Sequence, residues 1–400
     1  MLIIGRRLWR QLKKGKGDLR IGIDTLAAHY KKTGIGTYIS SLANTLPRVD
    51  GTNEYRLLVS RENAPIFEDG LPRTVKVFGP RVIDHTSVRV VWEHLCLPRV
   101  AVREGVSLLH CPTFIVPMRW RGPTVVTIHD LTWFTHAGQH IPVKRVYYQR
   151  LIPIAVRRAV RVIAITESTR RDLLRILGVP EEKVVVVPYG VDRIFRPVED
   201  AGRIAALRQR YGIPERYLLF VGMLEPRKNL VRVVQAFGQL KSSDPILPHM
   251  LVLAGNKGWG YEEVRREVER LGLEREVVFT GPVPHDELPP LFSGADVFVY
   301  PSLYEGFGLP VVEAMACGTP VITSNVSSLP EVAGDAGLLV DPLDVAALAR
   351  AMRRVLSDGD LRQVMQMKGL EQAARFTWEE TARRTLQVYK EAWDGKNTVD

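Results

Sequence analysis

Short apolar runs rich in β-branched residues alternate along the chain with longer segments of helical periodicity. Such strands, separated by helices, are typical of βαβ units, in which helices cover both faces of a parallel sheet. The pattern predicts helices over 87–104, 140–159, 168–177 and 310–317. It predicts strands over 19–27, 55–60, 74–79, 107–112, 124–130, 161–167 and 183–190, and then over 217–224, 250–255, 276–281, 296–302 and 320–324.

The pattern pauses once, in the Pro- and Gly-marked segment 188–200, and then restarts. We therefore expect an α/β protein with two doubly wound, Rossmann-like domains. Such domains bind ligands at the carboxyl ends of their strands, which predicts a site in a central cleft. The expected division is a basic extension 1–18, a first domain 19–196, a second domain 197–375 and a closing segment 376–400.

Composition places the chain among ordinary globular proteins, with 46% hydrophobic and 25% charged residues in a length of 400. It contains no run of eighteen apolar residues, so we expect no transmembrane helix. The three cysteines, Cys96, Cys111 and Cys317, are too widely spaced for a disulfide framework or a zinc site. A reducing, cytoplasmic setting fits this usage.

The net charge of +11 is unevenly distributed. Residues 1–200 contain 32 Lys or Arg and 18 Asp or Glu, a net of +14, whereas residues 201–400 contain 23 and 26, a net of −3. This asymmetry predicts an anionic partner for the first half: nucleic acid, a membrane surface or a phosphate-linked substrate. Nucleic acid is disfavoured because the cations are dispersed over helices and form no recognisable binding module.

Residues 1–17 contain six basic residues and no acid. Ile4, Leu8 and Leu12 recur at helical spacing, which is typical of an interfacial membrane helix. Three glycines in the same segment favour a solvated basic tail, so both interpretations stay open. The segment lacks the apolar core and the cleavage site of a signal peptide.

The stretch "FVGMLEPRKNL" (220–230) ends a strand and enters a helix, with Asn229 as a plausible N-cap. Arg227 and Lys228 precede that helix, and two cations beside a helix N-terminus suit a diphosphate. An exposed basic turn is the alternative. A dehydrogenase is disfavoured because neither half has G-x-G-x-x-G: Gly34 and Gly36 are followed by isoleucine at 39, and the second half offers Gly222 alone.

The stretch "SLYEGFGLPVVEAMACGTPVI" (302–322) places Glu305 in a glycine-rich loop and Glu313 about one turn into a helix that ends at Gly318. The backbone N–H groups of 306–309 can approach a ligand closely because two of these residues are glycines. Two acceptors with donors between them suit an elongated ligand that has a diol at each end and anions in the middle. A nucleotide-sugar has this form.

At this point the chain resembles the retaining GT-B glycosyltransferases of family 4, over nearly its whole length. A further segment, 90–117, is similar to a subgroup that builds bacterial surface polysaccharides and often transfers mannose. The resemblance is carried by "TGIGTY" (33–38), "TIHDL" (127–131), "VPYGVD" (187–192), "FVGMLEPRKN" (220–229), "FTGPVP" (279–284), "YPSLYEGFGLPVVEAMACGTPVI" (300–322) and "FTWEETARRTLQVYKEA" (376–392).

The resemblance implies a GT-B fold whose last helix crosses back to the first domain. It implies that Arg227 and Lys228 hold the donor diphosphate and stabilise the leaving group, and that Glu305 faces the donor sugar near the reacting carbon. Glu313 would bind the ribose hydroxyls. Catalysis is assigned to Glu305, Arg227, Lys228 and His129, and donor binding to Gly36, Gly222, Arg227, Lys228, Val283, Glu305, Gly306, Phe307, Gly308, Leu309 and Glu313.

The implied mechanism is front-face attack by an acceptor hydroxyl, with the leaving phosphate taking its proton. No carboxylate is obviously placed as a nucleophile of the kind that a retaining hydrolase uses. His129 is expected to orient donor and acceptor, with a hydrogen-bonded structural histidine as the alternative. Neither half shows Asp-x-Asp at a strand end, so we expect no metal and no cofactor.

The expected reaction transfers a hexosyl group, with mannosyl from GDP-mannose favoured, to a hydroxyl of a glycan or of a polyprenyl-diphosphate-linked acceptor. The positive first domain suits an anionic lipid carrier, and therefore a cytoplasmic protein peripheral to the inner face of the membrane. Two alternatives remain: a nucleotide-sugar epimerase of the same fold, and a non-catalytic sugar-nucleotide-binding module.

Overall fold

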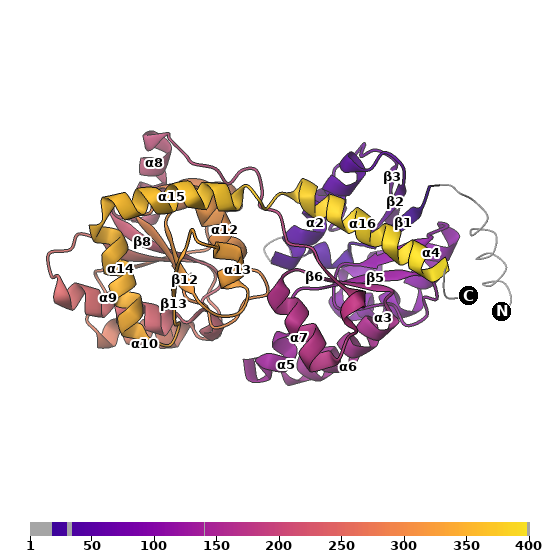
Figure 1. The fold of residues 1–400 in the computed structure, drawn as a ribbon, viewed down its shortest axis with the longest axis horizontal. Coiled ribbons are helices and arrows are strands. Elements are labelled where there is room, and N and C mark those ends of the chain that lie inside the picture. The colour runs from indigo at the N-terminus through magenta and orange to yellow at the C-terminus, as the bar shows by residue number, and fades with distance from the viewer. Residues whose placement is uncertain (1–17, 30–33, 140, 398–400) are drawn as a thin grey trace. The chain divides into compact units, whose positions relative to one another are not determined.

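Two parallel β-sheets organise the chain in the computed structural model, which describes residues 18–29, 34–139 and 141–397 (Figure 1). The chain forms two compact units: unit 1 is Met1–Gly190 with Trp378–Asp400, and unit 2 is Val191–Thr377. The two interpretations of residues 1–17 concern a segment outside the described residues. None of the described helices combines the length and the apolar composition that crossing a bilayer requires.

Unit 1 contains a seven-stranded sheet in the order β3-β2-β1-β4-β5-β6-β7, and all of its pairings are parallel. All seven strands predicted for the first half are confirmed. The strands are β1 (Arg20–Asp24), β2 (Glu54–Val59), β3 (Thr74–Phe78), β4 (Leu108–Cys111), β5 (Thr124–Ile128), β6 (Arg161–Ala164) and β7 (Val184–Val186).

The helices of unit 1 connect these strands, and its last helix comes from the end of the chain. They are α2 (Gly34–Val49), α3 (Thr86–Leu95), α4 (Leu97–Arg103), α5 (Thr132–Thr135), α6 (Pro142–Arg158), α7 (Glu167–Leu177) and α16 (Trp378–Asn397), with 3₁₀ turns η1 (Leu26–His29), η2 (Ala64–Ile66), η3 (Arg81–Asp84), η4 (Ala137–Gln139) and η5 (Glu181–Lys183).

The helix predicted over 87–104 is wrong in one respect, because the structure has two helices there. Helix α3 ends at Leu95 and α4 begins at Leu97. Pro98 lies in the first turn of α4 and has no N–H to donate to the carbonyl four residues earlier, so a continuous helix would lose a hydrogen bond at this position.

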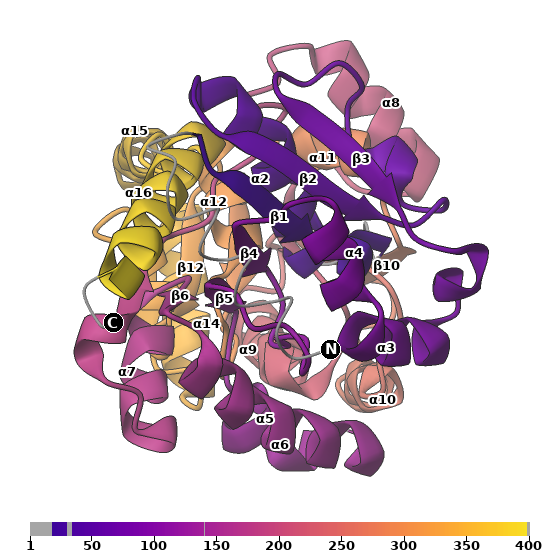
Figure 2. The same cartoon turned by 90° about the vertical axis from the view of Figure 1, so that its right-hand side faces the viewer.

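Alternate residues of β4 and β5 point to opposite faces of the sheet. Leu109 and Cys111 belong to a buried apolar cluster that also contains residues of α4, α6 and α7. His110 lies between them on the other face, where its Nδ1 is 2.7 Å from the Tyr389 hydroxyl of α16 and its Nε2 is 2.9 Å from Thr127 Oγ1. Figure 2 shows α16 alongside this sheet.

Helix α16 packs on unit 1, as the resemblance implied. It contacts α2, β5 and β6. Its inward stripe, Ala382, Thr385, Tyr389 and Ala392, recurs every three or four residues, and all four residues are buried. Helix α16 therefore completes unit 1, although the other elements of that unit lie nearly two hundred residues earlier in the sequence.

Unit 2 contains a six-stranded parallel sheet in the order β10-β9-β8-β11-β12-β13. The five predicted strands are confirmed, and β13 was not predicted. The strands are β8 (Tyr217–Val221), β9 (Met250–Ala254), β10 (Val277–Gly281), β11 (Val297–Tyr300), β12 (Val321–Ser324) and β13 (Leu338–Val340).

The helices of unit 2 follow the same alternation. The prediction of a helix over 310–317 that ends before Gly318 is confirmed, since Cys317 caps the helix and Gly318 has a positive φ of 74°. The helices are α8 (Ala201–Tyr211), α9 (Leu230–Ser243), α10 (Tyr261–Arg270), α11 (Leu288–Ser293), α12 (Leu309–Ala316), α13 (Leu329–Ala333), α14 (Val345–Ser357) and α15 (Gly359–Ala373), with 3₁₀ turns η6 (Pro226–Lys228) and η7 (His285–Glu287).

Candidate functional site

The strand order of unit 2 reverses between β8 and β11, which pair side by side. In doubly wound sheets, ligands bind outside the carboxyl ends of the strands at such a point. The loop after β8 contains Arg227 and Lys228, and the loop after β11 contains Glu305. Because the two strands are parallel neighbours, both loops leave the same edge of the sheet.

Asn229 fixes these two loops to each other. It precedes α9 in a left-handed conformation, with φ 63°, and its side chain makes no capping hydrogen bond, so the expected capping role is wrong. Its amide nitrogen instead donates to the carbonyls of Pro301 and Pro342, at 3.1 and 2.6 Å. The side chain is used to hold the β8 loop against the segments that follow β11 and β13.

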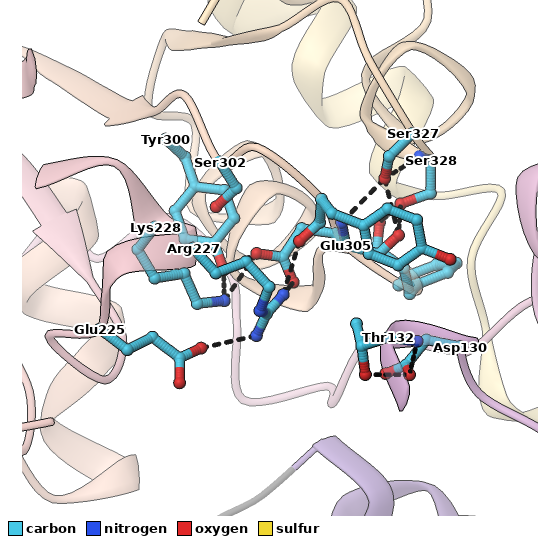
Figure 3. A network of polar contacts seen from close by, with 12 residues as sticks. Asp130, Thr132, Glu225, Arg227, Lys228, Tyr300, Ser302, Glu305, Ser327 and Ser328 are labelled. Carbon is cyan, nitrogen blue, oxygen red and sulfur yellow. Dashed lines mark hydrogen bonds and ion pairs between the residues drawn. The ribbon is translucent and has the colours of Figure 1, made fainter. Parts of the chain in front are cut away.

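Glu305 forms ion pairs with both cations of the neighbouring loop (Figure 3). Its Oε2 lies 2.9 Å from Arg227 Nη1, and its Oε1 accepts a hydrogen bond from Lys228 Nζ at 2.7 Å. Lys228 also donates to the Tyr300 hydroxyl, and Arg227 Nη2 donates to Glu225 Oε1 at 2.7 Å. We call these five residues the ion-pair cluster.

Burial and pairing act in opposite directions on the pKa values of this cluster. Burial opposes ionisation of Glu305, but the charges of Arg227 and Lys228 more than offset it and lower the pKa of the carboxyl to about 2. Burial lowers the pKa of Lys228, and the Glu305 charge opposes that shift. Glu305 is therefore a carboxylate at neutral pH, and it supplies the negative charge that stabilises a buried ammonium.

The glycine-rich loop that follows Glu305 is held by two serines. Ser327 Oγ accepts from the Glu305 N–H at 2.8 Å, and Ser328 Oγ is within donating distance of the carbonyls of Glu305 and Phe307, at 3.1 and 2.8 Å. Gly308 caps α12 with φ 103°, and a Cβ there would lie 2.7 Å from Leu329 Cδ2. A glycine is therefore required at this position by both the conformation and the available space.

Glu313 does not belong to the ion-pair cluster. It lies on α12, and its charged neighbours are His285 and Asp192, which approach each other at 3.4 Å. Burial raises the pKa of Glu313 to about 7, and of its two neighbours His285 opposes and Asp192 reinforces this shift. The hydrogen bond to Asp192 raises the pKa of His285. The two glutamates of the stretch 302–322 therefore differ in protonation near neutral pH.

The remaining predicted donor-binding residues of unit 2 lie on loops at the same edge of the sheet. Gly222 directly follows β8, with φ 152°, and its N–H donates to the Ala254 carbonyl at 2.9 Å. Val283 is half-buried in the loop between β10 and η7. Gly306, Phe307 and Leu309 follow Glu305, and the buried Phe307 ring makes an edge contact with Phe376 at a centroid distance of 5.5 Å.

In unit 1, Gly36 is buried in the first turn of α2, and His129 follows β5. Both nitrogens of the His129 ring are occupied: Nε2 donates to the Pro112 carbonyl at 2.7 Å, and Nδ1 accepts from the Tyr189 hydroxyl. Burial lowers its pKa to about 4. A base role for His129 would require one of these bonds to break, so its place in catalysis stays a prediction.

Sequence reasoning did not find four residues that shape this site: Glu225, Tyr300, Ser327 and Ser328. Glu225 and Tyr300 had a usable signal, since each lies within five residues of a predicted site residue at a strand end. No comparable signal marked Ser327 and Ser328, because their hydrogen bonds form only where the start of α13 lies beside the loop after β11. Among the described residues, no group of three or more His, Cys, Asp or Glu side chains is arranged to hold a metal ion.

Family models match both halves of the chain. Residues 32–194 match "Glycosyltransferase Family 4", and residues 204–372 match "Glycosyl transferases group 1". The O-antigen chain mannosyltransferase B of Escherichia coli is 32% identical over 93% of this chain and 100% of its own length. The serotype-specific mannosyltransferase WbdA of the same species is 30% identical over 69% of this chain, which spans 34% of that longer protein.

Among solved structures, HepE of Anabaena in complex with UDP and glucose superposes with a TM-score of 0.72 and 19% identity, covering 93% of this chain and 100% of that one. The fold is therefore that of the GT-B glycosyltransferases, with two parallel Rossmann-like sheets. The chain belongs to glycosyltransferase family 4, the group 1 glycosyltransferases, and is a retaining hexosyltransferase that uses a nucleotide-sugar.

Proposed function

We propose that this enzyme transfers a mannosyl group from GDP-mannose to a hydroxyl of a polysaccharide acceptor carried on a polyprenyl diphosphate. Two relatives named as mannosyltransferases, one of which matches over its whole length, support the sugar. The net charge of +14 in residues 1–200 supports an anionic lipid carrier and a place at the inner face of the membrane.

One observation carries the proposed donor site: two cations lie beside a carboxylate at the β8/β11 switch point. Of the three N–H groups of Lys228, the bonds among the described residues use two, to Tyr300 and Glu305, which leaves one for a phosphate oxygen. We assign Arg227 and Lys228 to the diphosphate and Glu305 to the orientation of both cations and of the adjoining sugar. Gly222, Val283, Glu313 and the backbone of 306–309 complete the proposed donor site.

In the proposed reaction the bond between the sugar C1 and the diphosphate oxygen breaks, and the acceptor oxygen forms a bond to C1 from the same face. The acceptor proton passes to an oxygen of the departing diphosphate. Arg227 and Lys228 stabilise the charge that develops on that diphosphate, a kind of electrostatic contribution worth roughly 10²–10³ in turnover per donor group. Because these cations can do this work, we propose that the reaction needs no metal ion.

The first test is a thermal-shift panel of GDP, UDP, ADP, dTDP and NAD, with EDTA present throughout. A ligand that binds the folded state raises its melting temperature by mass action, so GDP should give the largest shift. A larger shift with another nucleoside diphosphate would replace the donor base but keep the site. A shift with NAD alone would contradict the transferase site.

Product analysis separates the proposed function from its two alternatives. An epimerase converts the nucleotide-sugar without an acceptor, and a binding module releases no nucleotide. The transferase should release GDP from GDP-mannose only when a mannose-ended glycan or lipid-linked acceptor is present, beyond a slow hydrolytic background.

A further inference from the structure

Unit 1 exposes two stripes of aliphatic side chains on neighbouring helices. In α3 the exposed residues Val88, Val91 and Leu95 are spaced three and four positions apart, so they share one face. In α6 the exposed residues Val143, Val146 and Ile154 also share a face, and Val143 is 80% exposed. Trp92, which flanks the α3 stripe one turn after Val88, and Tyr148 on the other side of α6 pack on the apolar cluster of unit 1.

The two stripes are connected through the C-terminal ends of their helices. Met118, which is 54% exposed, lies between the ends of the two helices: its N–H donates to His94 of α3, and its carbonyl accepts from Arg158 of α6. Both views show α3 and α6 near each other (Figures 1 and 2). We call this surface the α3–α6 face.

The exposed charges of α6 and of the segment before it are nearly all cationic, and the acid of α3, Glu93, is buried 3.4 Å from Arg89. Residues 110–158 contain seven Lys or Arg and a single acid, Asp130. Asp130 is occupied within the chain, since its Oδ1 accepts from the N–H and the hydroxyl of Thr132. The exposed side chains of Lys144, Arg150 and Arg157 make no ion pair among the described residues, and they alternate with the aliphatic positions of α6.

We propose that the α3–α6 face is the surface by which unit 1 binds an anionic phospholipid bilayer. Cations around protruding aliphatic side chains match the two layers of a membrane interface, since the cations meet lipid phosphates and the aliphatic tips enter the boundary with the acyl chains. Arginine and lysine chains reach the headgroups while their stems cover apolar surface. An acidic protein partner would form ion pairs with the cations but would offer no apolar layer to Val143 and Met118.

The proposal rests on the exposed surface and on no assumption about the donor. It deepens the proposed function only by giving the lipid-linked acceptor a membrane against which unit 1 can lie. Vesicle binding and nucleotide binding therefore test separate claims, and either can fail while the other holds.

The test is co-sedimentation of the full chain with vesicles of phosphatidylcholine alone or of phosphatidylcholine mixed with phosphatidylglycerol. The variant Lys144→Gln, Arg150→Gln, Arg157→Gln removes three cations from the α3–α6 face. Each such cation contributes about fivefold to binding at an anionic surface, so this variant should bind mixed vesicles roughly 100-fold more weakly. The matched control removes three exposed arginines from unit 2: Arg203→Gln, Arg265→Gln, Arg350→Gln.

A second variant, Val143→Asn with Val146→Asn, keeps every charge and removes the aliphatic tips, and it should weaken binding by at least roughly tenfold. The control should bind like the parent chain, and all variants should keep the parent's melting temperature and its nucleotide-induced shift. Equal binding to both vesicle compositions, or an undiminished triple variant, would overturn the proposal. So would a dimer in solution that the Val143→Asn, Val146→Asn variant abolishes, since the face would then be an interface between two copies.

Discussion

Lys228 is the residue on which the charge balance of the candidate site depends most. Its side chain is 9% exposed and pairs with that of Glu305, which is equally buried. The cluster contains two cations and two carboxylates, so it is neutral before any ligand is added. Removing the ammonium leaves Glu305 with Arg227 as its one cationic partner and takes away a donor that we assign to the diphosphate.

We therefore expect Lys228→Met to lower kcat/KM by roughly 100-fold, the effect of losing one electrostatic donor to a developing charge. Methionine keeps most of the length of the side chain and most of its packing, so the fold should persist. Steady-state kinetics and urea unfolding measure the two effects separately. Lys368→Met, which removes an exposed lysine paired with Asp335, is the control and should leave kinetics unchanged. Unaltered kinetics in Lys228→Met would contradict the assignment.

Glu313 should make the free energy of unfolding depend on pH. Folding raises its pKa, whereas folding lowers the pKa of Glu305. The pKa of Glu313 is about 7 in the folded chain and near 4.5 in an unfolded one. Between these values the folded state binds a proton that the unfolded state has lost, so raising the pH through this window lowers the free energy of unfolding. Below pH 4.5 both states are protonated, and this contribution vanishes.

Glu313→Gln cannot ionise and should lack that pH dependence. Its free energy of unfolding should therefore rise relative to the parent chain as pH increases from about 4.5 to 8. Urea unfolding of both proteins at a series of pH values measures this difference. Parallel profiles would mean that Glu313 ionises as easily in the folded chain as in the unfolded one.

Residue types and spacing predicted that Arg227, Lys228 and Glu305 lie in loops at strand ends, and the structure places these loops on adjacent strands. The sequence did not predict that Glu305 pairs with both cations, because that pairing depends on side-chain conformations across two loops. The sequence also predicted the wrong hydrogen-bond partners for the Asn229 side chain. A helix N-cap depends on neighbouring residues alone, whereas the carbonyls of Pro301 and Pro342 reach Asn229 only because β8, β11 and β13 belong to one sheet.

At the scale of elements, the short α13 supports the loop that precedes α12. Ser327 and Ser328 come just before α13 and bond to the backbone around Glu305 and Phe307. The loop geometry thus depends on hydrogen bonds from a segment about twenty residues later. Its left-handed Gly308 cannot be replaced without both strain and a close contact with Leu329.

Ser328→Ala should loosen this loop. A buried hydroxyl that serves two carbonyls leaves both of them less satisfied when it is lost, at a cost of about 1–3 kcal/mol in the free energy of unfolding. We expect a higher KM for the donor together with that destabilisation, as measured by initial rates and urea unfolding. Ser357→Ala removes an exposed serine hydroxyl at the end of α14 and should change neither quantity.

The apolar pattern of the sequence was sufficient to predict most strands, but it did not predict every boundary between elements. Every apolar run that was predicted to be a strand forms one, because a strand covered on both faces must be apolar at nearly all positions. The three-residue β13 was missed, since Leu338–Val340 is too short to stand out from a loop. The break between α3 and α4 was missed for the opposite reason, because helical periodicity continues across Cys96 and only the missing N–H of Pro98 separates the two helices.

At the scale of the whole molecule, a buried polar network joins α16 to the sheet of unit 1. The Tyr389 hydroxyl bonds to His110, His110 bonds to Thr127, and Thr127 bonds to the Tyr38 hydroxyl of α2 at 3.0 Å. Burial lowers the pKa of His110 to about 3, so its ring is neutral and both nitrogens are matched by hydroxyls. These hydrogen bonds fix the position of α16 on the sheet, in addition to the burial of its apolar stripe.

Tyr389→Phe should lower the free energy of unfolding of unit 1 by about 1–3 kcal/mol, because it leaves a buried ring nitrogen of His110 without its partner. Hydrogen exchange of the β4 and β5 amides should accelerate accordingly, while the amides of β8 and β11 should not change. Tyr211→Phe is the control, since it removes a part-exposed hydroxyl bonded to Glu287 in unit 2. Faster exchange of β8 rather than β4 would contradict the assignment.

The position of α16 also has a consequence for biosynthesis. A ribosome releases residues 18–190 long before residues 378–397, so the nascent chain must complete all of Val191–Thr377 before unit 1 receives its last helix. Until then the surface that Tyr389 and Ala392 cover on unit 1 is open, and His110 lacks one of its two hydroxyl partners. Synthesis of unit 1 thus begins before that of unit 2 but ends after it. Premature termination anywhere in the second half of the chain would leave unit 1 without α16.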